Sequence, residues 1–282
     1  MNIAQRRAAL MERVRVYGGP LNEPAVMAQF MAQVMHESGG LRYVREVWGP
    51  TAAQRRYEGR ADLGNTQPGD GKRFMGRDVL QITGRANYRA LTAWVRREFG
   101  SKVDFEATPE ALEGAEWLGI GAIWYFLAAR PKLIRYCRDG NIEMVTRLVN
   151  GGLNGYADRL RWYDDAALKL LGFPTIKAFQ NAAGLSADGI SGPKTRAALH
   201  HALTAMSAPV TRPAPHVNET PKHEHDRPNV VQPEAVKIDA KDDSAAMLGK
   251  VIIAALALWA ATAAAWFTDL FEAVRDFLMF WQ

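Results

Sequence analysis

The sequence predicts a mainly helical fold. Apolar residues recur at helical spacing through most of residues 1–168, and glycine-rich turns separate these periodic segments. No convincing set of strands is found. A compact segment, a polar linker and an uncharged apolar run follow. We therefore expect a helical catalytic domain, a small helical module, a linker and a C-terminal transmembrane helix.

The clearest predicted helix lies in "NEPAVMAQFMAQVMHES" (22–38). Its apolar stripe comprises Val26, Phe30 and Val34, with Met27, Met31 and Met35 next to it. Asn22 is the expected N-cap, Pro24 suits the first turn, and Gly39-Gly40 is expected to end the helix. The methionines are interpreted as core packing.

Further helices are predicted near 86–99, 109–128, 132–138 and 141–149, with a closing helix over 160–172. The stretch from Trp48 to Phe74 is polar and has no clear helical period, which predicts a long loop with a functional role. Cys137 is the only cysteine, so the chain has no intramolecular disulfide, and we expect this residue to be buried.

The C-terminal part divides by composition. Residues 169–205 form a compact segment, and residues 206–246 have the composition of a flexible linker. Residues 251–268 carry no charge over a length that meets the minimum for a membrane span. We therefore predict a transmembrane helix over 247–268 and an amphipathic tail over 269–282, with a buried or surface-lying hairpin as the alternative. Lysines before the span favour a cytoplasmic orientation of the catalytic end.

The positive charge lies in the N-terminal part. Residues 1–168 carry 24 Lys/Arg and 19 Asp/Glu, whereas the remaining residues carry 11 of each. Basic domains favour polyanions, although an ordinary solvated surface is the alternative. No basic and aromatic stripe indicates nucleic acid. The first residues lack an apolar stretch long enough for a secretory signal, so we expect synthesis in the host cytoplasm.

His36-Glu37 is compatible with part of a zinc-protease motif. That motif needs a second histidine four residues after the first, where this chain has Gly40. Residues 1–199 contain no other histidine. The sequence therefore predicts no metal site there, and the histidines of the linker are interpreted as solvated.

Glu37 and Glu46 are candidates for a catalytic carboxyl pair. On an unbroken helix, nine residues correspond to about 900° of rotation, which would point the two side chains apart. The Gly39-Gly40 break lets the chain fold back, so that both can face one cleft. Glycoside hydrolysis needs two such groups across the scissile bond. The alternative is an ordinary polar helix end with Glu46 on the surface.

Three motifs in order carry a family resemblance: "HESGGLRYVRE" (36–46), "GDGKRFMGRDVLQITGRANY" (69–88) and "VNGGLNGYADR" (149–159). They resemble the family 19 glycoside hydrolases, of the chitinase type, and specifically the bacteriophage endolysin branch. The resemblance covers residues 1–168. It implies a helical fold of the lysozyme-like superfamily and hydrolysis of β-1,4 bonds of N-acetylated amino sugars with inversion, without a metal or organic cofactor.

The resemblance also implies roles for individual residues. Glu37 matches the general acid and Glu46 the general base that activates water. The matching substrate-positioning and cleft residues are Gln81, Thr83, Asn87, Asn150 and Arg159. We expect helix packing to shield Glu37 from water, and Arg45 or Arg159 to lie beside Glu46. Ordinary capping and turn bonds are the alternative role for Gln81, Thr83 and Asn87.

Two features distinguish this chain within the resemblance. The family usually reads Gly-Arg-Gly where this chain has Gly76-Arg77-Asp78, and a carboxylate there is expected to alter backbone geometry or affinity. The segment 48–65 replaces the loops typical of plant chitinases and resembles the endolysin branch, which favours peptidoglycan over chitin.

Residues 176–199 resemble one half-repeat of a peptidoglycan-binding module. The expected core residues are Phe179, Leu185, Ile190 and Leu199. Turns are expected at Asp188-Gly189 and Gly192-Pro193. Only one half-repeat is found, so wall binding and a purely structural role both stay open.

These observations predict a muramidase-type endolysin, a monomer that acts on peptidoglycan glycan strands and is anchored in the host inner membrane through residues 247–268. The alternatives are a chitinase acting on chitin oligomers, or a catalytically inactive wall-binding, membrane-associated protein, which the Asp78 departure alone favours. A pore-forming role of the tail is disfavoured by its single span.

Overall fold

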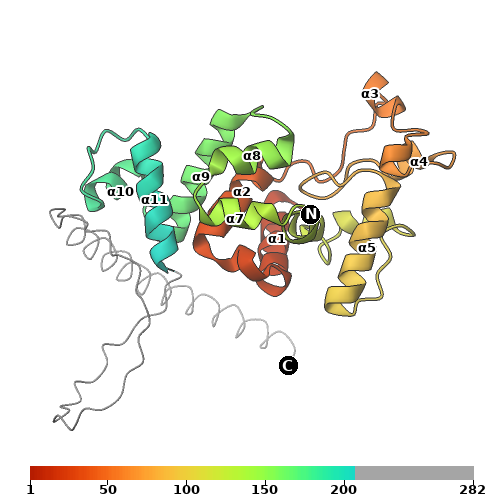
Figure 1. Cartoon of the computed structure of the whole chain (residues 1–282), viewed down its shortest axis with the longest axis horizontal. Coiled ribbons are helices and arrows are strands. Elements are labelled where there is room, and N and C mark those ends of the chain that lie inside the picture. Colours follow the sequence, from red (N-terminus) through yellow and green to blue (C-terminus); the bar gives the residue numbers. More distant parts are fainter. Residues whose placement is uncertain (207–282) are drawn as a thin grey trace, which may run out of the picture.

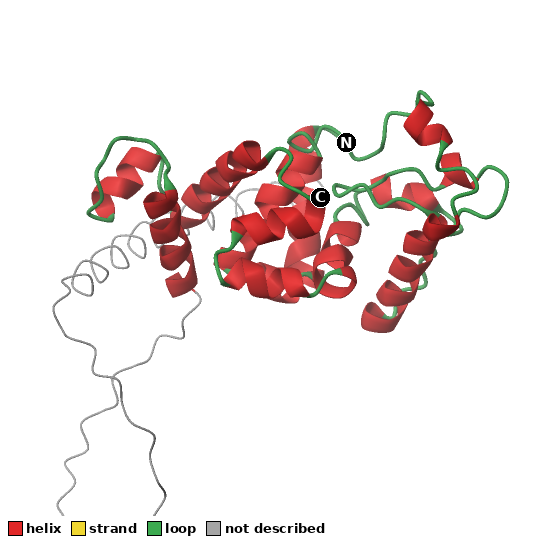
Figure 2. Ribbon diagram, turned by 45° about the horizontal axis from the view of Figure 1, so that its top comes forward, coloured by secondary structure: helices red, strands yellow, loops and turns green. Residues whose placement is uncertain are grey.

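The computed structural model describes residues 1–206, and this part of the chain consists of helices and connecting loops (Figures 1 and 2). β-pairing within it is limited to isolated antiparallel bridges that join Arg45 to Arg77 and Arg77 to Ile82. The predicted mainly helical fold class is therefore confirmed.

The predicted linker, transmembrane helix and tail lie C-terminal to this part of the chain. The linker beyond Met206, the transmembrane helix (247–268) and the tail (269–282) all lie outside the described residues. None of the helices in residues 1–206 combines the length and the apolar character that crossing a bilayer requires.

The helices are α1 (Ile3–Tyr17), η1 (Gly19–Asn22), α2 (Pro24–Glu37), α3 (Ala52–Arg55), η2 (Ala61–Leu63), α4 (Asp70–Arg73), α5 (Arg85–Phe99), η3 (Pro109–Glu113), α6 (Ile120–Trp124), η4 (Tyr125–Ala129), α7 (Lys132–Arg138), α8 (Ile142–Asn150), α9 (Tyr156–Leu171), α10 (Ile176–Ala182) and α11 (Pro193–Met206). The elements η1, η2 and η3 are 3-10 helices, and η4 is a π-helix.

Helix α2 lies at the centre of the helical body and packs against α7, α8 and α9 (Figure 1). Val26, Phe30 and Val34 are fully buried, and Met27 and Met35 are nearly so. The predicted core packing of this stripe is confirmed. Because α2 is buried almost all round, its C-terminal residue is held at a fixed position in the body.

The predicted N-cap of α2 was wrong by one residue. Asn22 ends the preceding 3-10 turn, and its side-chain amide donates to the backbone oxygen of Val14 at 3.0 Å. Glu23 is the N-cap and makes no side-chain capping bond. The Asn22 side chain, which the sequence pattern assigned to the N-cap of α2, therefore bonds to α1 instead.

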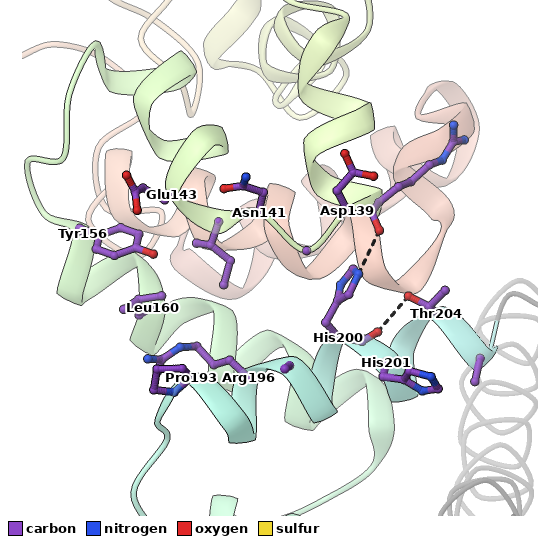
Figure 3. Close-up of a pocket in the computed structure, with 15 residues that line it drawn as sticks. Asp139, Asn141, Glu143, Tyr156, Leu160, Pro193, Arg196, His200, His201 and Thr204 are labelled. Carbon is purple, nitrogen blue, oxygen red and sulfur yellow. Dashed lines mark hydrogen bonds between the residues drawn. The ribbon is translucent and has the colours of Figure 1, made fainter. Parts of the chain in front are cut away.

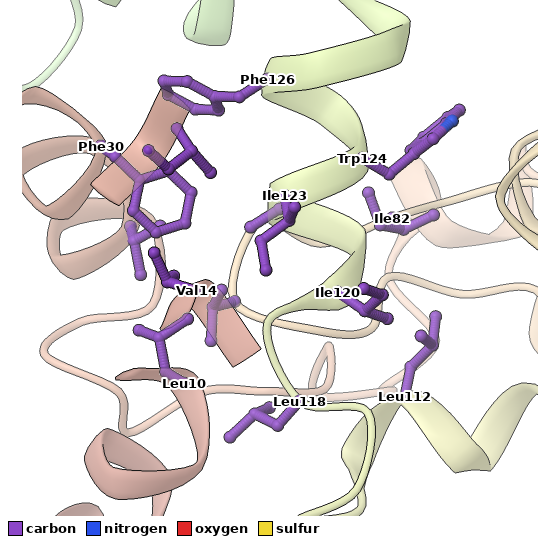
Figure 4. Packing of buried hydrophobic residues seen from close by; sticks show 14 of the residues in the cluster. Leu10, Val14, Phe30, Ile82, Leu112, Leu118, Ile120, Ile123, Trp124 and Phe126 are labelled. Carbon is purple, nitrogen blue, oxygen red and sulfur yellow. The ribbon is translucent and has the colours of Figure 1, made fainter. Parts of the chain in front are cut away.

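The main hydrophobic core lies where α1, α2 and α6 meet (Figure 4). Leu10 and Val14 of α1 are fully buried there, as is Ile123 of α6. Phe30 of α2 packs edge-on against Phe126, with ring centroids 5.1 Å apart. These contacts join the start of the chain to the segment that follows residue 118.

The predicted single helix over 109–128 is instead three short elements, η3, α6 and η4. The irregular stretch between η3 and α6 ends at Gly119, which has a φ of 93°. A Cβ atom there would lie 2.5 Å from Cδ1 of Leu10. The close approach of α1 thus favours glycine and a left-handed turn at a position where periodicity alone suggested a continuous helix.

The polar segment between Trp48 and Phe74 contains the short elements α3, η2 and α4, which no helical period predicted. An ion pair links it to the rest of the domain: Asp70 of α4 pairs with Arg85, which also pairs with Glu106 at 3.0 Å. Hydrogen bonds from Arg89 and Arg85 lower the pKa of Glu106 to about 2. The segment is therefore fastened by charge pairs as well as by packing.

Helices α10 and α11 pack against α9, and α11 also contacts α2. Phe179 and Leu199 are fully buried in a second hydrophobic cluster together with Tyr163 of α9. Leu185 is half-buried, whereas Ile190 is 70% exposed, so the expectation that Ile190 is a core residue was wrong. Its backbone carbonyl and amide bond to Gln180 and Asp188, and the loop turns the side chain to solvent.

Cys137 lies in α7 and is fully buried, as predicted. Burial raises the pKa of its thiol far above the ordinary value, because the interior disfavours the thiolate. A neutral, enclosed thiol of this kind packs as a small apolar side chain.

Candidate active site

The chain reverses direction directly after α2, which ends at Glu37. Gly39, Gly40 and Leu41 have φ values of 57°, 73° and 67°. The hydroxyl of Ser38 accepts the Leu41 N–H at 2.9 Å, and the Leu41 side chain is fully buried. The predicted helix end at Gly39-Gly40 is confirmed, and an anchored reversal separates Glu37 from the segment that carries Glu46.

Glu37 is held by Arg159, which reaches it from the start of α9. Arg159 Nη2 lies 2.5 Å from Glu37 Oε1, and Nη1 donates to Gln33 Oε1 at 2.5 Å. Gln33 in turn donates to the hydroxyl of Thr146 at 3.3 Å. Arg159 is 1% exposed and Glu37 is 29% exposed. The guanidinium therefore fixes the orientation of a carboxylate that still reaches solvent.

Neither Arg45 nor Arg159, the arginines considered for Glu46, forms an ion pair with that glutamate within residues 1–206. Arg159 contacts Glu37, and Arg45 Nη1 lies 3.6 Å from Glu113 Oε2. The placement of Arg159 follows from the packing of α9 on α2, which spacing along the chain does not reveal.

His36 forms a second link between the same two helices. Its Nδ1 lies 2.7 Å from Asp158 Oδ2, and Trp162 Nε1 donates to the same oxygen at 3.1 Å. The hydrogen bond from His36 lowers the pKa of Asp158 below its ordinary value. The ring lies against the backbone of Gly155, where an added Cβ would be 2.1 Å from Cε1. His36 thus fastens α2 to α9 next to Glu37.

Within residues 1–206, no group of three or more His, Cys, Asp or Glu side chains is arranged to hold a metal ion.

Within the described part of the chain, the donors to the Glu46 carboxylate are neutral. Gln54 Nε2 donates to Oε1 at 3.0 Å, the Tyr57 hydroxyl lies 3.4 Å from the same oxygen, and the Gly76 N–H donates to Oε2 at 3.1 Å. The backbone N–H of Glu46 donates to Gly76 O at 2.8 Å. The carboxylate is therefore fixed from two sides, by α3 and by the segment around Gly76.

Gln81 and Thr83 both lie beside Gly76, the residue that bonds to Glu46. A Cβ atom on Gly76 would be 2.6 Å from Gln81 Oε1 and 3.3 Å from Thr83 Oγ1. Both polar side chains therefore lie over the backbone that holds Glu46. Asn87 is exposed and donates to Thr83 O at 2.8 Å, which is a turn bond of the ordinary kind.

Asn150 is the last residue of α8. Its Nδ2 atom is buried and has no hydrogen-bond partner among residues 1–206. Helix α8 packs against α2 and α9, which carry Glu37 and Arg159. The candidate residues therefore fall into two groups, with Glu37, Arg159 and Asn150 on the helical body and Glu46, Gln81 and Thr83 around Gly76.

Asp78 is fully buried and does not face a substrate. Its Oδ1 accepts the Gly119 N–H at 2.6 Å, and Oδ2 accepts the Ala122 N–H at 2.9 Å. Burial raises the pKa of Asp78 to about 6, although these backbone donors favour the ionised form. The side chain therefore ties the segment that carries Gln81 to the start of α6.

Sequence reasoning did not identify Gln54 and Tyr57, which bond to Glu46. It also missed Gln33, which bonds to Arg159, the partner of Glu37. A signal was present for Gln54. Thr51 and Gln54 form a capping box at the start of α3, and a Thr-x-x-Gln pattern predicts such a start. Gln33 and Tyr57 carry no comparable pattern, because their partners are distant in sequence or lie in an irregular loop.

A pocket of about 820 Å³ lies elsewhere, between α11 and the elements α8 and α9 (Figure 3). Its lining includes Asn141, Glu143, Tyr156, Arg196 and His200, and none of the predicted site residues. The His200 ring lies 2.9 Å from the carbonyl of Arg138 and so connects α11 to the end of α7. The pocket is therefore a feature of the junction with α11 and separate from the two glutamates.

Replacing Arg159 with methionine is expected to destabilise the fold by about 2–4 kcal/mol, because it leaves Glu37 and the buried Gln33 without their cation. Urea unfolding measures the change. Arg161→Met on the same helix is the matched control, since Arg161 is 78% exposed and its one ion pair within residues 1–206 is with Asp158. Equal losses in the two variants would contradict a structural role for the Arg159 network.

Comparison with known proteins identifies a curated relative of this chain. No family model matches the chain. A Haemophilus influenzae protein described as a glycosyl hydrolase family 19 domain-containing protein is 30% identical over an alignment of 164 residues, which covers 48% of this chain and 76% of the relative.

Solved structures give weaker likenesses. Chitinase C from Streptomyces griseus is 18% identical, with a TM-score of 0.46, and the match covers 61% of this chain and 76% of that chain. A family 19, class IV chitinase from Zea mays is 22% identical, with a TM-score of 0.42, and the match covers 58% of this chain and 80% of that chain.

Proposed function

The chain belongs to the family 19 glycosyl hydrolases, and from this premise we propose that it is an inverting, muramidase-type endolysin that cleaves the β-1,4 bonds of bacterial peptidoglycan. The enzyme class, a glycoside hydrolase, follows from the family. The muramidase specificity and the role in host lysis are the proposed part.

In the proposed mechanism, Glu37 protonates the leaving oxygen of the glycosidic bond, and Glu46 removes a proton from water as the water attacks the anomeric carbon from the opposite face. One observation carries this assignment: the two glutamates stand at either side of an anchored reversal, each fixed by its own donors. Inversion needs about 6.5–9.5 Å between the carboxyl groups, which leaves room for water.

Gln81 and Thr83 are proposed to position the substrate and the attacking water, because their polar atoms lie next to the backbone that holds Glu46. Asn150 and Arg159 are proposed to support Glu37 from α8 and α9. Asn87 is proposed to contact substrate from the exposed start of α5. No metal ion or organic cofactor enters the proposed reaction.

The rest of the chain is proposed to bring the enzyme to its substrate. Residues 169–205 are proposed as an abbreviated peptidoglycan-binding module, residues 206–246 as a linker, 247–268 as a transmembrane helix and 269–282 as an amphipathic tail. The enzyme would then act as a monomer from the host inner membrane. Fractionating cells that express the full chain or a chain without residues 247–282 tests the anchor, and an unchanged membrane fraction after deletion would refute it.

Product analysis tests the bond cleaved. Purified peptidoglycan digested by the wild-type protein is expected to give muropeptides with muramic acid at the reducing end, in the α-configuration if the reaction inverts. Reducing-end glucosamine would refute the muramidase assignment. An anhydro end would show a lytic transglycosylase and would remove Glu46 from the mechanism.

A chitinase is the second candidate, favoured by the solved relatives' names. Turnover of chitohexaose well above turnover of peptidoglycan would support it. The inactive wall-binding alternative depended on Asp78, and the fully buried position of that side chain removes its support.

A further inference from the structure

Two exposed arginines follow the residue that holds Glu46. Gln54 is 4% exposed and donates both to Glu46 Oε1 and to the carbonyl of Val47 at 2.8 Å. Its own oxygen accepts the N–H groups of Gly49 and Thr51. Because Gln54 is fixed on all sides, the positions directly after it, Arg55 and Arg56, are fixed relative to Glu46.

Both arginines are exposed. Arg55 Nη1 donates to the carbonyl of Pro50 at 2.9 Å, which leaves its other donors free within the described part of the chain. Neither residue pairs with a carboxylate in residues 1–206. Two nearby arginines do pair with carboxylates: Arg45 pairs with Glu113, and Arg60 pairs with Asp62. The two side chains therefore carry uncompensated positive charge.

Both arginines extend from the short helix that holds Glu46. Arg55 ends α3 and Arg56 is its C-cap, directly after Gln54, which bonds to Glu46. Consecutive Cα atoms are about 3.8 Å apart, so the backbones of the two arginines lie within about 8 Å of the Gln54 backbone. Arginine also binds carboxylates through two parallel hydrogen bonds, which favours recognition over simple attraction.

We propose that Arg55 and Arg56 form a charge-selective subsite that binds the carboxylates of the peptide stems attached to the glycan strand. This inference rests on the proposed function, because chitin has the same backbone linkage but carries no such carboxylates. The subsite distinguishes the two polymers by a group that takes no part in bond cleavage. It therefore contributes to kcat/KM for peptidoglycan and leaves the chemistry at Glu37 and Glu46 unchanged.

The test compares the full-length wild type with Arg55→Gln/Arg56→Gln on three substrates. They are peptidoglycan freed of phosphate-bearing polymers, the same peptidoglycan after its carboxylates have been amidated, and chitohexaose. Arg7→Gln/Arg97→Gln is the matched control, since it removes two exposed positive charges on α1 and α5. Melting temperatures and chitohexaose turnover report whether each variant is folded.

On unmodified peptidoglycan the Arg55/Arg56 variant is expected to lose about fivefold to tenfold in kcat/KM at low salt, with less loss at high salt. Chitohexaose turnover and the control variant should change by less than about twofold. On amidated peptidoglycan the wild type should fall to the level of the variant, which assigns the effect to carboxylates and excludes phosphate.

Other outcomes separate the two proposals. Equal losses on peptidoglycan and chitohexaose, or an unchanged variant on peptidoglycan, would overturn the subsite while the endolysin proposal stands. A wild-type protein that hydrolyses chitohexaose and leaves peptidoglycan intact would instead refute the proposed function itself.

Discussion

Replacing Glu37 with glutamine is expected to lower kcat/KM for glycan hydrolysis by about a thousandfold, since general acid catalysis contributes about 10²–10⁴-fold. Glutamine has nearly the same shape and still accepts a hydrogen bond from Arg159, so the fold should be retained. It has no proton to deliver to the leaving oxygen. Sugar release from labelled peptidoglycan and from chitohexaose measures the loss on either substrate.

Glu98→Gln is the matched control for this variant. Glu98 is exposed near the end of α5, and its one ion pair in the part of the chain that the structure describes is with the neighbouring Arg97, so its replacement should leave turnover unchanged. A Glu37→Gln protein with near-normal turnover and a normal melting temperature would exclude Glu37 from the chemistry.

The roles of the two glutamates need separate tests, because their surroundings differ. Glu37 contacts the cation Arg159. Glu46, among residues 1–206, is held by neutral donors. A synthetic substrate with a dinitrophenyl leaving group needs no acid, so it should restore turnover of Glu37→Gln and not of Glu46→Gln. The reverse result would exchange the two roles.

Features set by local chemistry were predictable from the sequence. The end of α2 is an example, because Gly39 and Gly40 occupy left-handed positions that glycine adopts without strain. The burial of the Val26, Phe30 and Val34 stripe is another, since helical spacing places these side chains on one face.

Features set by distant contacts were not predictable. The partner of Arg159 depends on how α9 packs on α2, and the split of the predicted helix over 109–128 depends on Leu10 approaching Gly119. Asp78 looked like a change at the substrate segment because its partners, the N–H groups of Gly119 and Ala122, lie more than 40 residues further along the chain.

Replacing Asp78 with alanine is expected to destabilise the protein by about 3–5 kcal/mol. It leaves two buried backbone N–H groups at the start of α6 without acceptors, and each such loss costs about 1–3 kcal/mol. Alanine at a φ of 67° adds backbone strain. Urea unfolding measures the change, and Asp62→Ala is the control, because the exposed Asp62 has the exposed Arg60 as its one ion-pair partner among the described residues.

Asp78→Gly separates these two contributions. Glycine removes the same acceptors but adopts positive φ freely. We therefore expect Asp78→Gly to be more stable than Asp78→Ala by about 1 kcal/mol and still less stable than wild type. A glycine variant as stable as wild type would show that the two hydrogen bonds contribute nothing to the fold.

The pH dependence of the wild type gives an independent check. The pKa of Asp78 is about 6 in the folded protein, above its ordinary value of 3.8. The folded state therefore binds this proton more tightly than the unfolded state does. Stability from this group is therefore greatest below pH 4 and falls as pH rises toward 6. The stability gap between wild type and Asp78→Ala should accordingly be wider at pH 4.5 than at pH 7.5. A gap that narrows on acidification would mean that Asp78 is stabilised as a carboxylate, and that its bonds to α6 outweigh the cost of burying the charge.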